Sequence, residues 1–168
     1  AIYGLADGLS VGMGQGFARL EHTWDGVTST STGFGATGLF VMKRLARGQG
    51  GILSVQPRMD VPLLYYTEKR PALGPVEPEA EVRLLYGNGY GVAGTRGFLS
   101  ASAGYAPIRA GEPEVRYDLT LGIDAHPRVL VMGQAFNVAA FSDGEVAYSA
   151  SKLGLSAVYR ASEGLGIQ

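Results

Sequence analysis

Sustained alternation of apolar and polar residues is the feature of this 168-residue chain that most constrains its fold. Residues 115–124 carry an apolar residue at every odd position and a polar residue or glycine at every even one. Residues 53–61, 79–86, 99–105 and 149–161 follow the same pattern with few interruptions. Because successive side chains of an extended strand point to opposite faces, this period predicts half-buried β-strands. No comparable helical period occurs, so we expect an all-β fold.

The alternating segments predict about ten strands that follow one another as antiparallel hairpins. Most of the strands run to roughly 9–16 residues, which exceeds the usual strand of soluble sheets and suits a tilted transmembrane strand. We therefore expect one domain over residues 1–168, an antiparallel up-and-down transmembrane β-barrel whose first and last strands are incomplete. The predicted strands are residues 1–6, 9–24, 32–45, 49–61, 78–91, 95–107, 113–125, 127–141, 147–162 and 163–168.

The composition favours a surface that is not mainly in contact with water. Charged residues make up 17% of the chain, against about 25% in typical soluble domains. The 14 basic and 15 acidic residues give a net charge of −1, which argues against a nucleic-acid partner. With no cysteine there is no disulfide framework and no thiolate metal site, and we expect no cofactor. The chain lacks a signal peptide and a long apolar helix, so we expect a trimmed piece with sequence missing at both ends.

The connections between the predicted strands alternate between short and long. Short turns are predicted at residues 6–8, 46–50, 92–95, 125–127 and 162–164, and longer loops at 25–31, 62–77, 108–112 and 142–146. Such alternation is typical of outer-membrane barrels, which have short periplasmic turns and longer external loops. The Ser/Thr run at residues 28–32 is interpreted as the flexible tip of an external loop.

Aromatic residues fall toward the strand ends, whereas the strand centres hold Leu, Val and Ala. Two aromatic bands around an aliphatic belt are typical of the two interfaces of a membrane. The predicted aromatic girdle consists of Trp24, Tyr66, Tyr86, Tyr105, Tyr117, Tyr148 and Tyr159.

The polar face of the alternating strands is predicted to line the lumen, because a charge turned toward lipid at mid-bilayer costs about 2–4 kcal/mol. A barrel of about ten strands has a narrow interior, and charges of both signs could pair across it and close it. The predicted lumen residues are Gln56, Arg58, Asp60, Glu81, Arg83, Arg116, Asp118, Lys152 and Arg160.

Three segments carry a family resemblance that runs through most of the chain. They are residues 3–12 (YGLADGLSVG), residues 77–87 (EPEAEVRLLYG) and residues 152–160 (KLGLSAVYR). On these segments the chain resembles uncharacterised proteobacterial outer-membrane β-barrel proteins. The resemblance implies the outer membrane of a Gram-negative bacterium, with membrane lipids or lipopolysaccharide as partners, and no established activity. Barrels of this kind usually end on an aromatic residue, whereas this chain ends on residues 166–168 (GIQ).

Residues able to carry catalysis are few. His22 is the weak candidate for a general base, since it is expected near the external end of a strand with acidic residues close in sequence. Glu21 points to the opposite face of the strand and cannot orient it, so Asp60 or Glu79 would have to do so. The charged, proline-rich loop 62–77 is a candidate contact for other envelope proteins.

Three function classes remain open. The first is a structural or scaffold barrel of the envelope, with a charge-lined lumen that is closed. The second is a narrow pore or transporter for small polar solutes, and the third is an outer-membrane surface hydrolase. Balanced lumen charge and narrow calibre favour the first class, so we do not expect an enzyme.

Overall fold

The computed structural model describes residues 1–62, 73, 77–92, 94–109, 112–162 and 165–167. These residues form one antiparallel sheet of ten strands, in which every strand pairs with the next along the chain. The strands are β1 (Ile2–Ala6), β2 (Leu9–Trp24), β3 (Val27–Gly48), β4 (Gly51–Val61), β5 (Glu79–Val92), β6 (Thr95–Arg109), β7 (Glu112–His126), β8 (Val129–Ser142), β9 (Glu145–Ser162) and β10 (Leu165–Ile167). Within this described part, no helix has the length and apolarity needed to cross a membrane.

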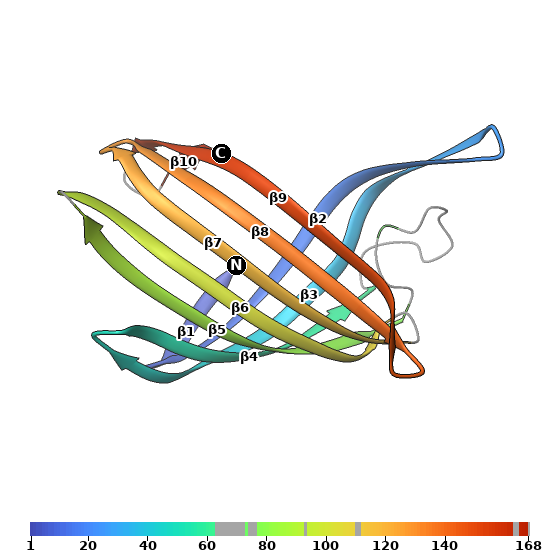
Figure 1. Cartoon of the computed structure of the whole chain (residues 1–168), viewed down its shortest axis with the longest axis horizontal. Coiled ribbons are helices and arrows are strands. Elements are labelled where there is room, and N and C mark those ends of the chain that lie inside the picture. Colours follow the sequence, from blue (N-terminus) through green and yellow to red (C-terminus); the bar gives the residue numbers. More distant parts are fainter. Residues whose placement is uncertain (63–72, 74–76, 93, 110–111, 163–164, 168) are drawn as a thin grey trace.

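The sheet is curled but open. Figure 1 shows long, tilted strands wrapped into a curved wall, with β1 and β10 as its terminal strands. In the described part of the chain, β1 pairs with β2 alone and β10 with β9 alone. The predicted all-β, antiparallel up-and-down topology is therefore confirmed, whereas the sheet does not close into a barrel.

Two predicted long loops are two-residue turns. Asp25 and Gly26 join β2 to β3 with φ angles of 48° and 75°, and Asp143 and Gly144 join β8 to β9 with 52° and 82°. Two successive positive φ angles fit the type I′ turn, whose twist matches that of paired strands and which favours Asp-Gly. A polar run such as residues 28–32 can then continue as a strand, because its backbone is paired.

The predicted alternation of short and long connections is consequently wrong. Residues 28–32 lie inside β3 and are not a loop tip. The predicted loops 25–31 and 142–146 shrink to turns, and β6 and β7 extend so far that only residues 110–111 separate them. Residues 62–78 remain the one long connection between strands, and most of that segment lies outside the described residues.

The strand ends define two ends of the molecule. The Asp7 end holds the connections at residues 7–8, 49–50, 93–94, 127–128 and 163–164, and the Trp24 end holds those at 25–26, 62–78, 110–111 and 143–144. In Figure 1 the Asp7 end lies to the left and the Trp24 end to the right.

One hairpin projects beyond the Trp24 end. The pairing of β3 with β4 ends at Thr37 and Val61, whereas β2 and β3 remain paired as far as Trp24 and Val27. Figure 1 shows this ribbon rising away from the rest of the sheet. At its base the rings of Phe17 and Phe34 meet edge to face, with centroids 5.4 Å apart, a geometry that aromatic pairs prefer.

Burial is reversed relative to a water-soluble domain. Among the described side chains, Ala106 is the one buried hydrophobic residue. The buried polar residues are Ser31, Thr37, Ser54, Asp60 and Glu81. Along β7 the apolar side chains at odd positions 117–123 are exposed, while the polar or glycine positions between them are buried or half-buried. The apolar face of the sheet is therefore the outer face, and the polar face lies inside the curl.

Candidate functional site

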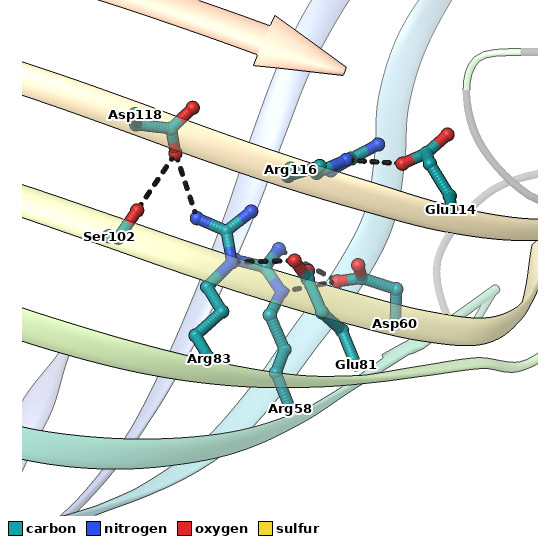
Figure 2. A network of polar contacts seen from close by, with 8 residues as sticks. All are labelled: Arg58, Asp60, Glu81, Arg83, Ser102, Glu114, Arg116 and Asp118. Atoms are coloured by element: carbon teal, nitrogen blue, oxygen red, sulfur yellow. Dashed lines mark hydrogen bonds and ion pairs between the residues drawn. The ribbon is translucent and has the colours of Figure 1, made fainter. Parts of the chain in front are cut away.

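A network of charged side chains lies on the inner face of β4 to β7 (Figure 2). Its first elements are pairs two residues apart on one strand, which share a face because side chains alternate. On β4, Nε and Nη2 of Arg58 donate to Asp60 Oδ1 over 2.9 and 2.7 Å. On β5, Arg83 Nε donates to Glu81 Oε1 over 2.8 Å. The period-two arrangement of the sequence thus places each cation beside an anion of its own strand.

Arg83 also links two strands that are not neighbours. Its Nη1 donates to Asp118 Oδ2 on β7 over 3.2 Å, and Ser102 on β6 donates to the same oxygen over 3.2 Å. Gly104 of β6 lies opposite Arg83 in the register, and a Cβ there would collide with the Glu81 carboxylate and touch the Arg83 stem. The glycine therefore leaves the space through which Arg83 reaches across β6.

The network is largely withdrawn from solvent. The side chain of Glu81 is 3% exposed and that of Arg83 is 18% exposed. Glu81 Oε2 has no hydrogen-bond partner among the described residues. Removing charges from water is costly unless each is paired, so Arg83 is the cation that makes the burial of Glu81 tolerable.

A cavity of about 420 Å³ adjoins the network at β7 to β9. Its charged lining consists of Arg83, Arg116, Asp118 and Lys152, and the Phe136 ring forms part of its apolar wall. Arg116 binds Glu114, whereas Lys152 forms no ion pair with a described residue. The arrangement offers one uncommitted cation beside an aromatic ring.

Of the remaining predicted lumen residues on the inner face, Gln56 lies beside the network and Arg160 lies apart from it. Gln56 pairs with Arg83 in the β4–β5 register. Arg160 bonds Asp124 Oδ1 over 2.7 Å and the Pro127 carbonyl oxygen over 3.3 Å, at the Asp7 end. The lumen role assigned to the whole set stays a prediction.

Sequence reasoning missed the partners Ser102, Glu114 and Asp124. Glu114 and Asp124 have the parity of the predicted lumen residues Arg116 and Asp118 on their own strand, and that parity was the available signal. No lumen residue was predicted on β6, which holds Ser102. The parity of a strand says which face a residue occupies, but not which residue of the neighbouring strand lies opposite it.

The predicted aromatic girdle is placed unevenly. Tyr105 and Tyr117 are exposed on the outer face toward the Trp24 end, whereas Tyr148, exposed near the same end, pairs with Ala140 and has the parity of the inner-face Lys152. Tyr86 and Tyr159 lie toward the Asp7 end, where the Tyr86 hydroxyl donates to the Gly50 carbonyl. Trp24 is the last residue of β2 and lies at the tip of the projecting ribbon, opposite Val27. Tyr66 and most of loop 62–77 lie outside the described residues.

His22 is not brought to a carboxylate that could orient it. It lies on the projecting ribbon opposite Ser29, whereas Asp60 lies opposite Gly38 and Glu79 lies opposite Asp60. Ser29 and Gly38 are nine positions apart on β3, which is roughly 30 Å along a strand. Within the described ranges there is also no cluster of three or more metal-binding side chains. The dyad considered from sequence is therefore not assembled.

A separate ion pair forms at the Asp7 end. Arg44 Nη2 lies 2.5 Å from Asp7 Oδ1. The hydrogen bond from Arg44 and the charge of Arg44 hold the pKa of the Asp7 carboxyl below its usual value, with smaller contributions from Arg47 and Lys43. Several cations therefore gather around this turn.

Comparison of the chain with protein-family models, with curated proteins and with solved structures gave no match.

Proposed function

We propose that the chain is an integral β-barrel of a Gram-negative outer membrane that acts as a structural or scaffold component of the envelope. The single observation that carries this proposal is the reversal of burial across the sheet. Leu153 and Leu155 are 83% and 88% exposed on the outer face, while Glu81 is 3% exposed on the inner face.

Solvation decides between lipid and water as the surroundings of the outer face. Monomeric soluble proteins rarely expose a contiguous apolar patch beyond a few hundred Å². Here exposed apolar side chains follow one another across several strands, for example Val82, Tyr105, Leu119 and Leu153 on β5, β6, β7 and β9. Hydrocarbon solvates such a face at no cost, whereas water does not.

Closure of the sheet is part of the proposal. A bilayer supplies no hydrogen bonds to the backbone groups of a free strand edge, so spanning sheets close on themselves. The topology is compatible with closure, because consecutive antiparallel strands already carry the chain around the inner face.

The paired charges favour a scaffold over an open channel. Arg83 joins β5 to β7 across the inner face, and Arg58 and Arg116 are held by anions on their own strands. In a barrel of about ten strands such side chains fill much of the narrow interior. The second candidate, a narrow pore for small polar solutes, is favoured by the cavity at Lys152.

Insertion into lipid vesicles tests the membrane proposal. Protein refolded from urea into phosphatidylcholine vesicles should float with the lipid, resist extraction by carbonate, and migrate differently on gels before and after boiling. Protein that stays soluble and folded without detergent or lipid would overturn the proposal.

Single-channel recording in planar bilayers separates the two candidate roles. The scaffold proposal expects no steady openings from the wild-type protein. Steady openings of uniform conductance would replace the scaffold with the pore.

A further inference from the structure

The exposed charges of the described residues are separated along the strands, although the whole chain is nearly neutral with 14 basic and 15 acidic residues. Four exposed cations lie at the Asp7 end. They are Lys43, Arg47, Arg96 and Arg128, here named the basic collar. None of the four forms an ion pair or a side-chain hydrogen bond with a described residue. The cations of the collar are therefore uncommitted.

The collar residues lie in or near the strand connections at the Asp7 end. Arg47 lies opposite Ile52 beside the 49–50 turn, Arg96 follows the connection at residues 93–94, and Arg128 lies in the 127–128 turn. Lys43 adjoins Arg44, whose backbone N–H donates to the Gly8 carbonyl over 2.7 Å. The collar thus follows the rim from β3 to β8.

Among the described residues, the anions at this end are already engaged by other cations. Asp7 binds Arg44 and Asp124 binds Arg160, over 2.5 and 2.7 Å. Lys43 and Arg47 also act on the Asp7 carboxylate through their charge, but no collar residue forms a direct ion pair with a described side chain. An external anion is what the collar lacks.

At the opposite end, the exposed charged side chains that the structure describes are mainly acidic. Exposed anions at the Trp24 end are Glu21, Asp25, Glu77, Asp143 and Glu145. Among the side chains described there, Arg19 is the one exposed cation, and it pairs with Glu21 at 3.9 Å. Among the described side chains, exposed cations therefore gather at the Asp7 end and exposed anions at the Trp24 end.

We propose that the basic collar binds the phosphate groups of anionic phospholipids in the leaflet at the Asp7 end. This inference rests on the proposed membrane span. Guanidinium and ammonium groups are good partners for phosphate oxygens. The four cations are spread along a rim instead of converging on a cavity, so they fit a surface of many headgroups better than one soluble anion. Tyr86 and Tyr159 at the same end are residue types that settle at the headgroup level.

A titration with short-chain lipids tests the collar. Wild-type protein refolded in zwitterionic micelles receives dihexanoyl-phosphatidylglycerol or dihexanoyl-phosphatidylcholine, and the midpoint of thermal unfolding is followed. We expect phosphatidylglycerol alone to raise the midpoint, and high salt to reduce the rise because exposed charges are screened.

A charge-removing variant and a charge-keeping variant locate the effect. The combination K43Q, R47Q, R96Q and R128Q should weaken the apparent affinity for phosphatidylglycerol by at least about tenfold, because each juxtamembrane cation contributes to the attraction. The combination K43R, R47K, R96K and R128K should retain it. Arg19→Gln, at the other end, should also leave the affinity unchanged.

Three results would overturn the proposal. They are an equal rise with phosphatidylcholine, an equal rise with inorganic phosphate, and an unchanged response in the charge-removing variant. The inorganic phosphate result would assign the collar to soluble anions. Failure of the wild type to insert into phosphatidylcholine vesicles would instead contradict the proposed membrane span. The lipid selectivity of the collar would still be measurable in micelles.

Discussion

Asp7 shows how a single residue acquires a charge state from its neighbours in the fold. It lies in the turn between β1 and β2, where an isolated aspartate would titrate near its reference value of about 3.9. Arg44 reaches this turn because the pairing of β2 with β3 extends to Leu9 and Lys43, and the Arg44 guanidinium donates to Asp7 Oδ1. The interaction favours the carboxylate, so the pKa of Asp7 is lowered.

This geometry predicts the titration of Asp7. Because the pKa of Asp7 is lower in the folded protein than in the unfolded chain, the stabilisation from the pair is present above the unfolded value. It is lost as the pH falls through the folded pKa. Carboxyl ¹³C NMR should show Asp7 titrating below an ordinary aspartate, and Arg44→Gln should raise its pKa toward the ordinary range. Arg19→Gln is the control, and an unchanged Asp7 pKa in Arg44→Gln would contradict the assignment.

Strands and hairpins are the elements that the sequence predicts best. Every alternating segment forms a strand within a few residues of its predicted bounds, because the two faces meet different surroundings and a one-residue slip would exchange them. The failures lie where alternation is absent. Residues 28–32 are polar at every position, so no period marks them as a strand, although the Asp25-Gly26 turn signal precedes them.

The candidate site was predictable as a face but not as a network. Parity placed Arg83, Arg116 and Asp118 together on the inner face. The bond from Arg83 to Asp118 also depends on two successive register offsets and on the absence of a side chain at Gly104. These offsets are fixed by turn lengths, which sequence reasoning overestimated at several connections.

Arg83 is the residue whose removal should most weaken the link between β5 and β7. Arg83→Met would leave the buried Glu81 carboxylate without its cation, at a cost of about 3–5 kcal/mol in the free energy of unfolding. Urea unfolding in micelles measures it. Combining Glu81→Gln with Arg83→Met should recover part of the loss, because the uncompensated charge is then absent.

A matched surface pair provides the control for Arg83. Arg19 and Glu21 lie 3.9 Å apart with side chains 70% and 59% exposed, so Arg19→Met should cost less than about 1 kcal/mol. If Arg83→Met and Arg19→Met reduced the free energy of unfolding equally, the buried ion pair would contribute no more to stability than the exposed one.

At the scale of the whole molecule, the open edges and the apolar outer face both require the sheet to close if it spans a membrane. Strand β9 pairs with β8 along its length but with β10 only near its end, at residues 159–162. Its remaining outer edge presents backbone groups next to the exposed Leu153 and Leu155. Apolar side chains draw this edge toward lipid, while its backbone groups require hydrogen bonds that lipid does not provide. Pairing of the two free edges satisfies both conditions, which is why the proposed membrane protein must be a closed one.

Adjacent positions on β9 allow the surroundings of the two faces to be measured. Leu155 points outward and is 88% exposed. Gly154 faces inward, and a Cβ atom added at this position would have no other atom within 4 Å. Leu155→Arg should destabilise the protein folded in vesicles, reducing its free energy of unfolding by about 2–4 kcal/mol, as expected for a cation facing lipid at mid-bilayer. Gly154→Arg should be tolerated, since its side chain enters a polar interior. In a water-soluble sheet an exposed Leu155→Arg would change stability by no more than about 0.5 kcal/mol, so equal behaviour of the two variants would assign the outer face to water.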